Sequence, residues 1–186
     1  MTGKVFVLSL HRCGTRSTDR LLRDLGYSTV HWGRMVVREK PFAGLTRADA
    51  FAAFLPVLGR FDGFSDVPFN CFFEDLDRTF PDARFLLLTR DVEGWIRSVR
   101  DHIGDRGLSP FEALQYGLHG DIPSPYITDW TDAQLGGFHE AHIRAVRRHF
   151  ASRPGKLLVR DLHADAGPAI CAFLGADAGL ALPDIG

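Results

Sequence analysis

The sequence predicts an α/β protein with three layers (α/β/α), in which a central, mainly parallel sheet lies between two layers of helices. Predicted strands alternate with predicted helices along the chain, which is typical of parallel sheets whose crossovers are helical. The strands are short, continuous apolar runs such as RFLLLT at Arg84–Thr89, as expected where both faces of a sheet are covered. The chain of 186 residues (1–186) is expected to form a single domain, because this length supplies one sizeable core.

Each predicted strand is an apolar segment bounded by polar residues, glycine or proline. The strands are expected at Lys4–Leu10, Tyr27–His31, Gly63–Asp66, Arg84–Thr89 and Lys156–Leu162. Polar loops follow the first and the fourth of them directly. In parallel sheets, ligands bind beyond the carboxyl ends of the strands, so these two loops are the first places to look for a site.

The predicted helices have apolar residues at helical spacing and recognisable ends. They are expected at Thr15–Leu25, Thr46–Leu55, Phe72–Phe80, 90–104, Pro110–Leu118, Asp132–Phe150 and Gly167–Leu174. Gly26 is suited to end the first helix, Pro56 is a point where the second can be disturbed, and Trp95, Val99 and Ile103 share one stripe of the fourth. The remainder of 104–130, rich in glycine and proline, is expected to be a variable loop.

Composition excludes several classes of function. Apolar residues make up 45% and charged residues 24% of the chain, and the net charge is −1, so no bulk field attracts nucleic acid or an anionic membrane. The three cysteines are widely spaced and odd in number, which fits a reducing compartment. No apolar run approaches the length of a membrane span. We therefore expect a cytoplasmic protein without nucleic-acid partners or membrane insertion; the oligomeric state is not indicated.

The first loop, HRCGTRST from His11 to Thr18, has the features of an anion site. A strand, a tight turn at Gly14 and a helix starting near Thr15 direct unpaired backbone N–H groups and the positive end of the helix dipole to one place. Arg12, Arg16 and Ser17 add guanidinium and hydroxyl groups, which bind phosphate-like oxygens.

Two chemistries fit this loop poorly. A Walker-type nucleotide hydrolase needs a lysine after its last glycine, whereas Gly14 is followed by Thr15. A cysteine phosphatase needs an arginine six positions after its nucleophile, but the residue six positions after Cys13 is Asp19. Cys13 is therefore expected to be a small filler that faces the sheet.

The loop resembles the 5′-phosphosulfate loop of sulfotransferases. Arg12 stands where that family has a lysine, Cys13 occupies its variable position, and Gly14, Thr15 and Arg16 match directly. In this resemblance Arg12 stabilises the bridging oxygen of the leaving group. Cys13, Gly14, Thr15, Arg16 and Ser17 then belong to the donor site, where the backbone N–H groups of Gly14 and Thr15 and the hydroxyls of Thr15 and Ser17 hold the 5′-phosphate.

A second stretch resembles the same family. In that family, an arginine at a strand end and a serine eight positions later hold the 3′-phosphate of the donor. The run here is FPDARFLLLTRDVEGWIRSV, and the corresponding residues are Arg90 and Ser98. LLVRDLHADAGPAICAFLG resembles its closing strand and helix. The resemblance implies a P-loop NTPase-like sulfotransferase fold and 3′-phosphoadenosine 5′-phosphosulfate (PAPS) as co-substrate, without a metal.

Sulfuryl transfer also needs a base for the acceptor hydroxyl. The family places a histidine or a carboxylate at the position of Asp66 in the run SDVP, and His11 and His31 are alternative proton acceptors near the predicted site. His139 and His142 lack the H-E-x-x-H spacing of a zinc helix and are expected on the helix surface or on the acceptor side.

The acceptor is expected to be a hydroxyl or amine of a small molecule or a glycan, bound near the variable region 104–130. The chain lacks the R-K-G-x-x-G-D run with which many sulfotransferases complete the adenine and 3′-phosphate site, so the sequence leaves adenine recognition open. Two rivals also stay open: a kinase of similar fold, which would require magnesium, and a nucleotide-binding relative without catalysis.

Overall fold

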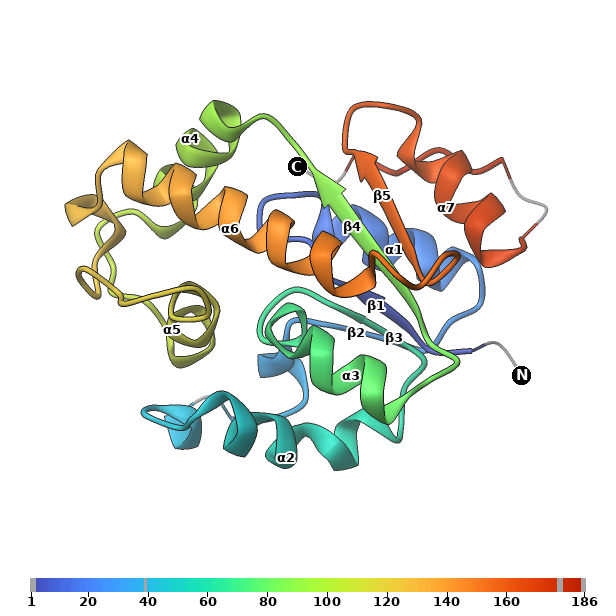
Figure 1. Cartoon of the computed structure of the whole chain (residues 1–186), viewed down its shortest axis with the longest axis horizontal. Coiled ribbons are helices and arrows are strands. Elements are labelled where there is room, and N and C mark those ends of the chain that lie inside the picture. The colour runs from blue at the N-terminus through green and yellow to red at the C-terminus, as the bar shows by residue number, and fades with distance from the viewer. Residues whose placement is uncertain (1–2, 39, 177–178, 185–186) are drawn as a thin grey trace.

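The computed structural model describes residues 3–38, 40–176 and 179–184, which contain one five-stranded, all-parallel sheet in the order β2-β3-β1-β4-β5 (Figure 1). The strands are β1 (Val5–Val7), β2 (Thr29–His31), β3 (Gly63–Ser65), β4 (Arg84–Thr89) and β5 (Leu157–Asp161). β1 is therefore the middle strand. The predicted parallel α/β fold is confirmed, and β4 has the predicted bounds.

The helices of the described chain connect one strand to the next, except α7, which follows the last strand. They are α1 (Thr15–Asp24), α2 (Arg47–Leu58), α3 (Phe73–Thr79), α4 (Val92–Ile103), α5 (Pro110–Tyr116), α6 (Asp132–Phe150) and α7 (Ala166–Leu174), with short 3-10 turns at Gly33–Met35, Lys40–Phe42, Phe69–Phe72 and Ile127–Asp129. α6 has the predicted bounds. α2 continues past Pro56, so proline does not end it there.

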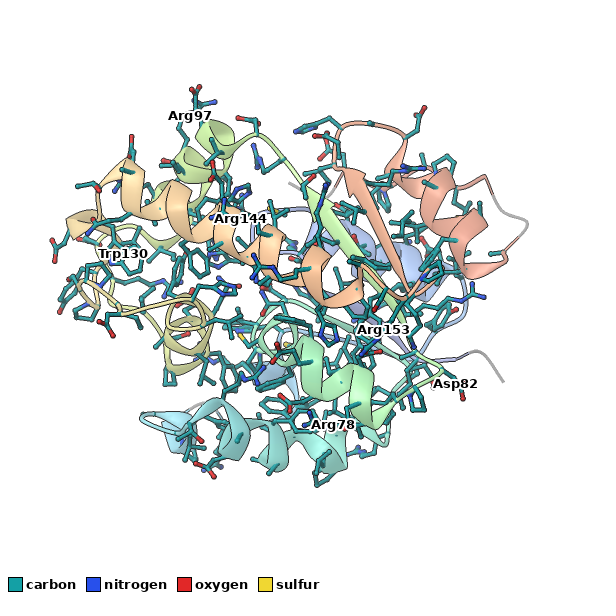
Figure 2. The ribbon with its side chains drawn as sticks, in the orientation of Figure 1. Arg78, Asp82, Arg97, Trp130, Arg144 and Arg153 are labelled. Atoms are coloured by element: carbon teal, nitrogen blue, oxygen red, sulfur yellow. The ribbon has the colours of Figure 1, made fainter. Side chains whose placement is uncertain are left out.

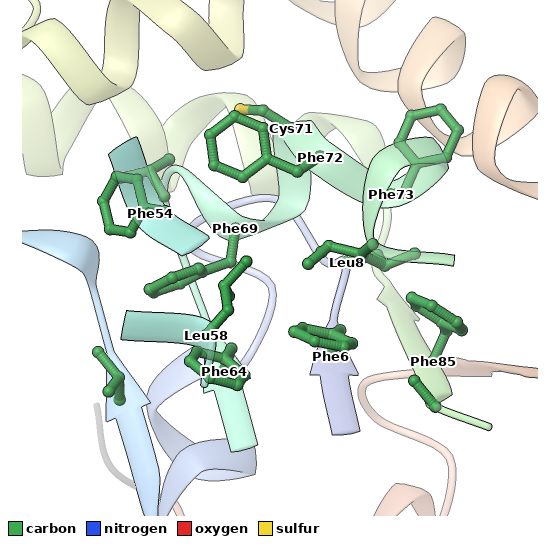
Figure 3. Close-up of a cluster of buried hydrophobic side chains, with 14 of the residues drawn as sticks. Phe6, Leu8, Phe54, Leu58, Phe64, Phe69, Cys71, Phe72, Phe73 and Phe85 are labelled. Atoms are coloured by element: carbon green, nitrogen blue, oxygen red, sulfur yellow. The ribbon is translucent and has the colours of Figure 1, made fainter. Parts of the chain in front are cut away.

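The side chains of β1 alternate between two hydrophobic layers, as the pleat requires. Val5 and Val7 pack toward α1 and α7 on one face of the sheet. Phe6 packs on the other face, toward α2, α3 and α6, and its ring lies 5.1 Å from that of Phe64 and 5.6 Å from that of Phe85 (Figure 3). Both faces are covered, which makes the three-layer architecture.

The charged residues of α4 and α6 lie on the outer surface. Arg97 projects from the ribbon and Arg144 lies along α6 (Figure 2), where it forms an ion pair of 2.9 Å with Glu140 in which both side chains are about 60% exposed. Exposed pairs of this kind contribute little to stability. Within the described residues, no helix is both long enough and apolar enough to span a bilayer.

The expectation for the two α6 histidines is wrong, because both His139 and His142 are buried. His142 Nε2 donates to the Leu8 carbonyl at 2.7 Å, so its Nδ1 accepts from His119 Nε2 at 3.3 Å. The end of β1 is thereby tied to α6. Helical periodicity alone did not reveal this contact, since the partner is a backbone carbonyl directly after β1.

Stability should fall in mild acid because of His142. Burial lowers the pKa of His142 to about 4, although the bond to Leu8 acts in the opposite direction. The unfolded chain, with an ordinary histidine pKa of about 6.5, takes up the proton first as the pH falls. The low pKa of His142 should therefore lower the free energy of unfolding by up to about 3 kcal/mol as the pH falls from 6.5 to 4.

Urea unfolding of the wild type and His142→Gln at pH 7, 5.5 and 4.5 measures this effect, because glutamine keeps a donor for Leu8 without titrating. The difference in unfolding free energy between the two proteins should shrink steadily as the pH falls. A difference that stays constant over this range would contradict the assignment.

Candidate active site

A cavity of about 850 Å³ runs along the carboxyl ends of the strands. Residues at or after the ends of all five strands line it. They include His31 at the end of β2, Trp32 and Arg34 after β2, Asp66 and Val67 after β3, His11, Arg12, Gly14, Thr15, Arg16 and Ser17 after β1, Arg90 after β4, and Leu162 and His163 after β5. Its size suits a nucleotide or a similar ligand. The two loops singled out from the sequence meet in this cavity.

The loop after β1 presents the start of α1 to the cavity. Gly14 is the N-cap, with φ of 73°, and no side chain of the described residues caps this helix. Side chains cap α2, α4, α5 and α6, whereas α3 and α7, like α1, lack a side-chain cap among the described residues. The first-turn N–H groups of α1, which no carboxylate of its own first turn faces, are therefore suited to bind an anion.

Gly14 is required at this position for two reasons. Its left-handed backbone disfavours residues with a side chain. In addition, a Cβ there would lie 2.4 Å from Leu162 Cδ1, in the loop after β5. The turn at Gly14 therefore lies in direct contact with the loop after β5, which keeps the loop after β1 compact.

Three hydrogen bonds fasten the first loop to the segment after β4. Trp95 Nε1 donates to the His11 carbonyl at 3.0 Å, and Arg90 Nη1 donates to the Arg12 carbonyl at 3.1 Å. Arg12 itself has a left-handed backbone, with φ of 63°, and its Nε donates to Ser98 Oγ at 2.9 Å. The residues that the sequence assigned to two separate phosphate subsites are thus directly connected.

Arg90 has an unsatisfied donor. Its Nε is buried and has no hydrogen-bond partner among the described residues, while the residue lines the cavity. A buried guanidinium N–H without an acceptor is costly. An anion in the cavity beside Arg90 would satisfy this nitrogen.

Cys13 and Ser98 differ from the other predicted donor residues, since neither is among the described residues that line the cavity. Cys13 is buried in the cluster that contains Trp95 and Tyr116, and its N–H donates to the Leu10 carbonyl at 3.1 Å. Burial raises the pKa of the Cys13 thiol to about 12, so the thiol is protonated at neutral pH. The expected burial is confirmed, but Cys13 packs on the cluster of α4, α5 and α6 rather than on the sheet.

Asp66 stands at the carboxyl end of β3 and faces the first loop. Its backbone is left-handed, with φ of 69°, and its Oδ1 accepts a bond of 2.8 Å from the Val67 N–H. The other oxygen, Oδ2, lies 3.5 Å from both Thr15 Oγ1 and His31 Nε2. The carboxylate is thus held in position while one oxygen stays directed toward the cavity, between the anion site and His31.

The other two candidate bases are arranged differently. His31 Nδ1 lies 2.9 Å from Ser65 Oγ, so this ring is positioned next to Asp66 by β3. His11 Nε2 lies 2.7 Å from the hydroxyl of Tyr116, and burial lowers the pKa of His11, which keeps the ring neutral. Since Tyr116 already occupies its Nε2, His11 is the less available proton acceptor.

The sequence did not single out the polar wall supplied by α4 and α5. His102, Arg106, Ser109 and Glu112 line the cavity, and Arg106 binds Glu112 through two bonds of 2.7 Å. Burial acts to raise the pKa of Glu112, but the bonds from Arg106 and the Ser109 N–H outweigh it and the pKa falls to about 2. The run SPFE, a capping box, was the available signal.

Among the aromatic residues, Trp32 lines the cavity and has a left-handed backbone, with φ of 67°. Phe69, Phe72 and Phe73 instead belong to the main core. Among the described residues that line the cavity, Trp32 is therefore the one tryptophan, tyrosine or phenylalanine. Phe69, Phe72 and Phe73 have an ordinary packing role.

Comparison with known proteins gives a family and a fold. Residues 4–184 match the family model of the sulfotransferase domain. Ava biosynthesis cluster protein M of Aspergillus versicolor is 28% identical over 109 residues, which cover 53% of this chain and 42% of that relative's length. The crystal structure of a sulfotransferase from Alicyclobacillus acidocaldarius is similar with a TM-score of 0.53 and 19% identity, covering 99% of this chain and 85% of that one.

Proposed function

Because this chain belongs to the sulfotransferase family, we propose that it transfers a sulfuryl group from PAPS to a hydroxyl or amine of a small molecule or a glycan, without a metal. One observation carries the proposal. The uncapped start of α1 and Arg90, whose buried Nε has no partner among the described residues, line one cavity, as expected for two anionic groups on one ligand.

The residues around the first loop suit the 5′-phosphosulfate. The N–H groups at the start of α1 and the hydroxyls of Thr15 and Ser17 supply donors, and no acidic residue stands in the first turn of this helix. Arg16 adds positive charge at the cavity wall. Arg90 and Ser98 would together hold the 3′-phosphate. Preorganised donors of this kind are typically worth about 2.7–4 kcal/mol each in the transition state.

Asp66 is the proposed base. As the acceptor oxygen attacks sulfur, the bond between sulfur and the bridging oxygen breaks, and the acceptor proton passes to Asp66 Oδ2. The 3.5 Å approach of this oxygen to Thr15 Oγ1 supports a position next to the phosphosulfate. His31, also at 3.5 Å from Oδ2, would orient the carboxylate and accept the proton from it.

Arg12 is proposed to stabilise the charge that develops on the leaving bisphosphate. Its Nε is bound to Ser98, so the Nη groups of the same guanidinium would bind the bridging oxygen. The name of the fungal relative, a biosynthesis cluster protein, supports a small-molecule acceptor rather than a macromolecule.

Calorimetric titration tests the donor class. The wild type should bind adenosine 3′,5′-bisphosphate, the product of the reaction, equally well with magnesium and with a chelator. It should bind ATP with magnesium much more weakly, because ATP lacks a 3′-phosphate for Arg90. Preference for ATP with magnesium would favour the kinase alternative, and binding of neither ligand would refute the proposed donor site.

A further inference from the structure

The cavity continues past Arg90 to a part of the chain that neither phosphate subsite uses. Leu162 and His163, in the loop after β5, line it together with Leu182, Pro183 and Asp184 near the end of the described chain. Two segments that are far apart in the sequence therefore form one wall. No residue of this wall was a candidate from the sequence.

This C-terminal segment, residues 180–184, is packed firmly against the start of α7. A Cβ on Gly167 would lie 2.3 Å from the Leu182 backbone nitrogen and 2.4 Å from the Leu180 carbonyl oxygen. The contact is between backbones, and only glycine permits it. Leu182 and Leu162 both pack on the hydrophobic cluster of α1 and α7, so the segment has a defined position beside the cavity.

The strand order gives the cavity a direction. The anion site at the start of α1 follows β1, Arg90 follows the neighbouring β4, and Leu162 follows β5 at the sheet edge. Asp66 lies on the opposite side of β1, after β3. A nucleotide whose phosphates bind after β1 and β4 therefore has room for its base on the β5 side, away from the reacting end.

We propose that the C-terminal segment and the loop after β5 form the binding site for the purine base of the donor, an inference that rests on the proposed function. Leu162, Leu182 and Pro183 supply apolar contacts to the faces and edges of the base. Asp184 supplies a carboxylate that accepts a hydrogen bond from an exocyclic amino group, as adenine has. The segment thus takes the place of the R-K-G-x-x-G-D run that the sequence lacks.

The test compares three ligands: adenosine 3′,5′-bisphosphate, inosine 3′,5′-bisphosphate, which has an oxygen in place of the amino group, and ribose 3,5-bisphosphate, which has no base. Affinities are measured for the wild type, Leu182→Ala, Asp184→Ala and the control Leu180→Ala. Leu180 is on the same segment, is 39% exposed and is not among the described residues that line the cavity.

Leu182→Ala should bind both base-bearing ligands roughly tenfold more weakly, since apolar contact is lost. Asp184→Ala should lose the preference for adenosine over inosine, roughly tenfold in the wild type. All variants should bind ribose 3,5-bisphosphate as the wild type does, which also reports an intact fold, and Leu180→Ala should bind all three ligands normally.

The outcomes separate the two proposals. If the wild type binds adenosine 3′,5′-bisphosphate and the Leu182 and Asp184 variants bind it equally well, the base site is refuted while the proposed function stands. If the wild type binds none of the three ligands, the proposed function fails, and the base site fails with it.

Discussion

Arg90→Ala should weaken the binding of adenosine 3′,5′-bisphosphate by about 3 kcal/mol, roughly 100-fold or more. Arg90 is the residue whose buried Nε has no acceptor among the described residues. Its guanidinium lies beside the start of α4, close enough that a Cβ on Gly94 would be 2.9 Å from its Nη2. A bound phosphate would satisfy the orphan donor, and alanine removes both the charge and the donor geometry.

The control must separate ligand binding from loop position, because Arg90 also donates to the Arg12 carbonyl. Arg90→Lys keeps the positive charge but cannot form the bidentate hydrogen bonds of a guanidinium. Its affinity for adenosine 3′,5′-bisphosphate should therefore lie between those of the wild type and Arg90→Ala. Arg97→Ala removes an exposed arginine of the same region and should leave affinity unchanged. Calorimetry that finds wild-type affinity in Arg90→Ala would remove Arg90 from the site.

Asp66→Asn should lower kcat for sulfuryl transfer by roughly 100- to 10,000-fold, the usual contribution of a general base. Asparagine tolerates the left-handed backbone of this position, and its amide oxygen can still accept from the Val67 N–H. The loop should therefore keep its shape. Affinity for adenosine 3′,5′-bisphosphate should not fall by more than threefold, because the carboxylate is a proton acceptor in this proposal and not a donor to the phosphates.

His31→Gln and His11→Gln identify the base among the three candidates. If Asp66 takes the proton from the acceptor, His31→Gln should cost less than tenfold in kcat, since it loses the neighbour that positions the carboxylate and later accepts the proton from it, but not the base itself. His11→Gln should act mainly through its lost contact with Tyr116. A large loss of kcat in either histidine variant, together with an active Asp66→Asn, would give the role to that histidine.

Local pattern predicted the elements well and the contacts between them less well. β4 and α6 have the predicted bounds because a six-residue apolar strand and a capped, 19-residue helix are strong local signals. The buried position of His142 depends on the carbonyl of Leu8, directly after β1, more than 130 positions away in the sequence. No periodicity carries that information.

In the candidate site, too, the sequence predicted the local segments but not the contacts between distant ones. The sequence indicated the loops after β1 and β4, since strand, turn and helix are adjacent in the chain. The bond between Arg12 and Ser98, the approach of His31 to Asp66 and the wall at Leu182 each join distant segments. Such contacts follow from the order of strands in the sheet, which a single sequence specifies only through the complete fold.

The middle position of β1 has a consequence for how such a protein can diversify. On the proposed function, β4 and β5 supply the half that reads the shared donor, whereas β2, β3 and α5 supply the half that meets the acceptor. Selection for a new acceptor can therefore act on one flank of the sheet while the other is inherited unchanged. Substitutions on the β2 flank would alter the range of acceptors, whereas those on the β5 flank would alter the affinity for the donor.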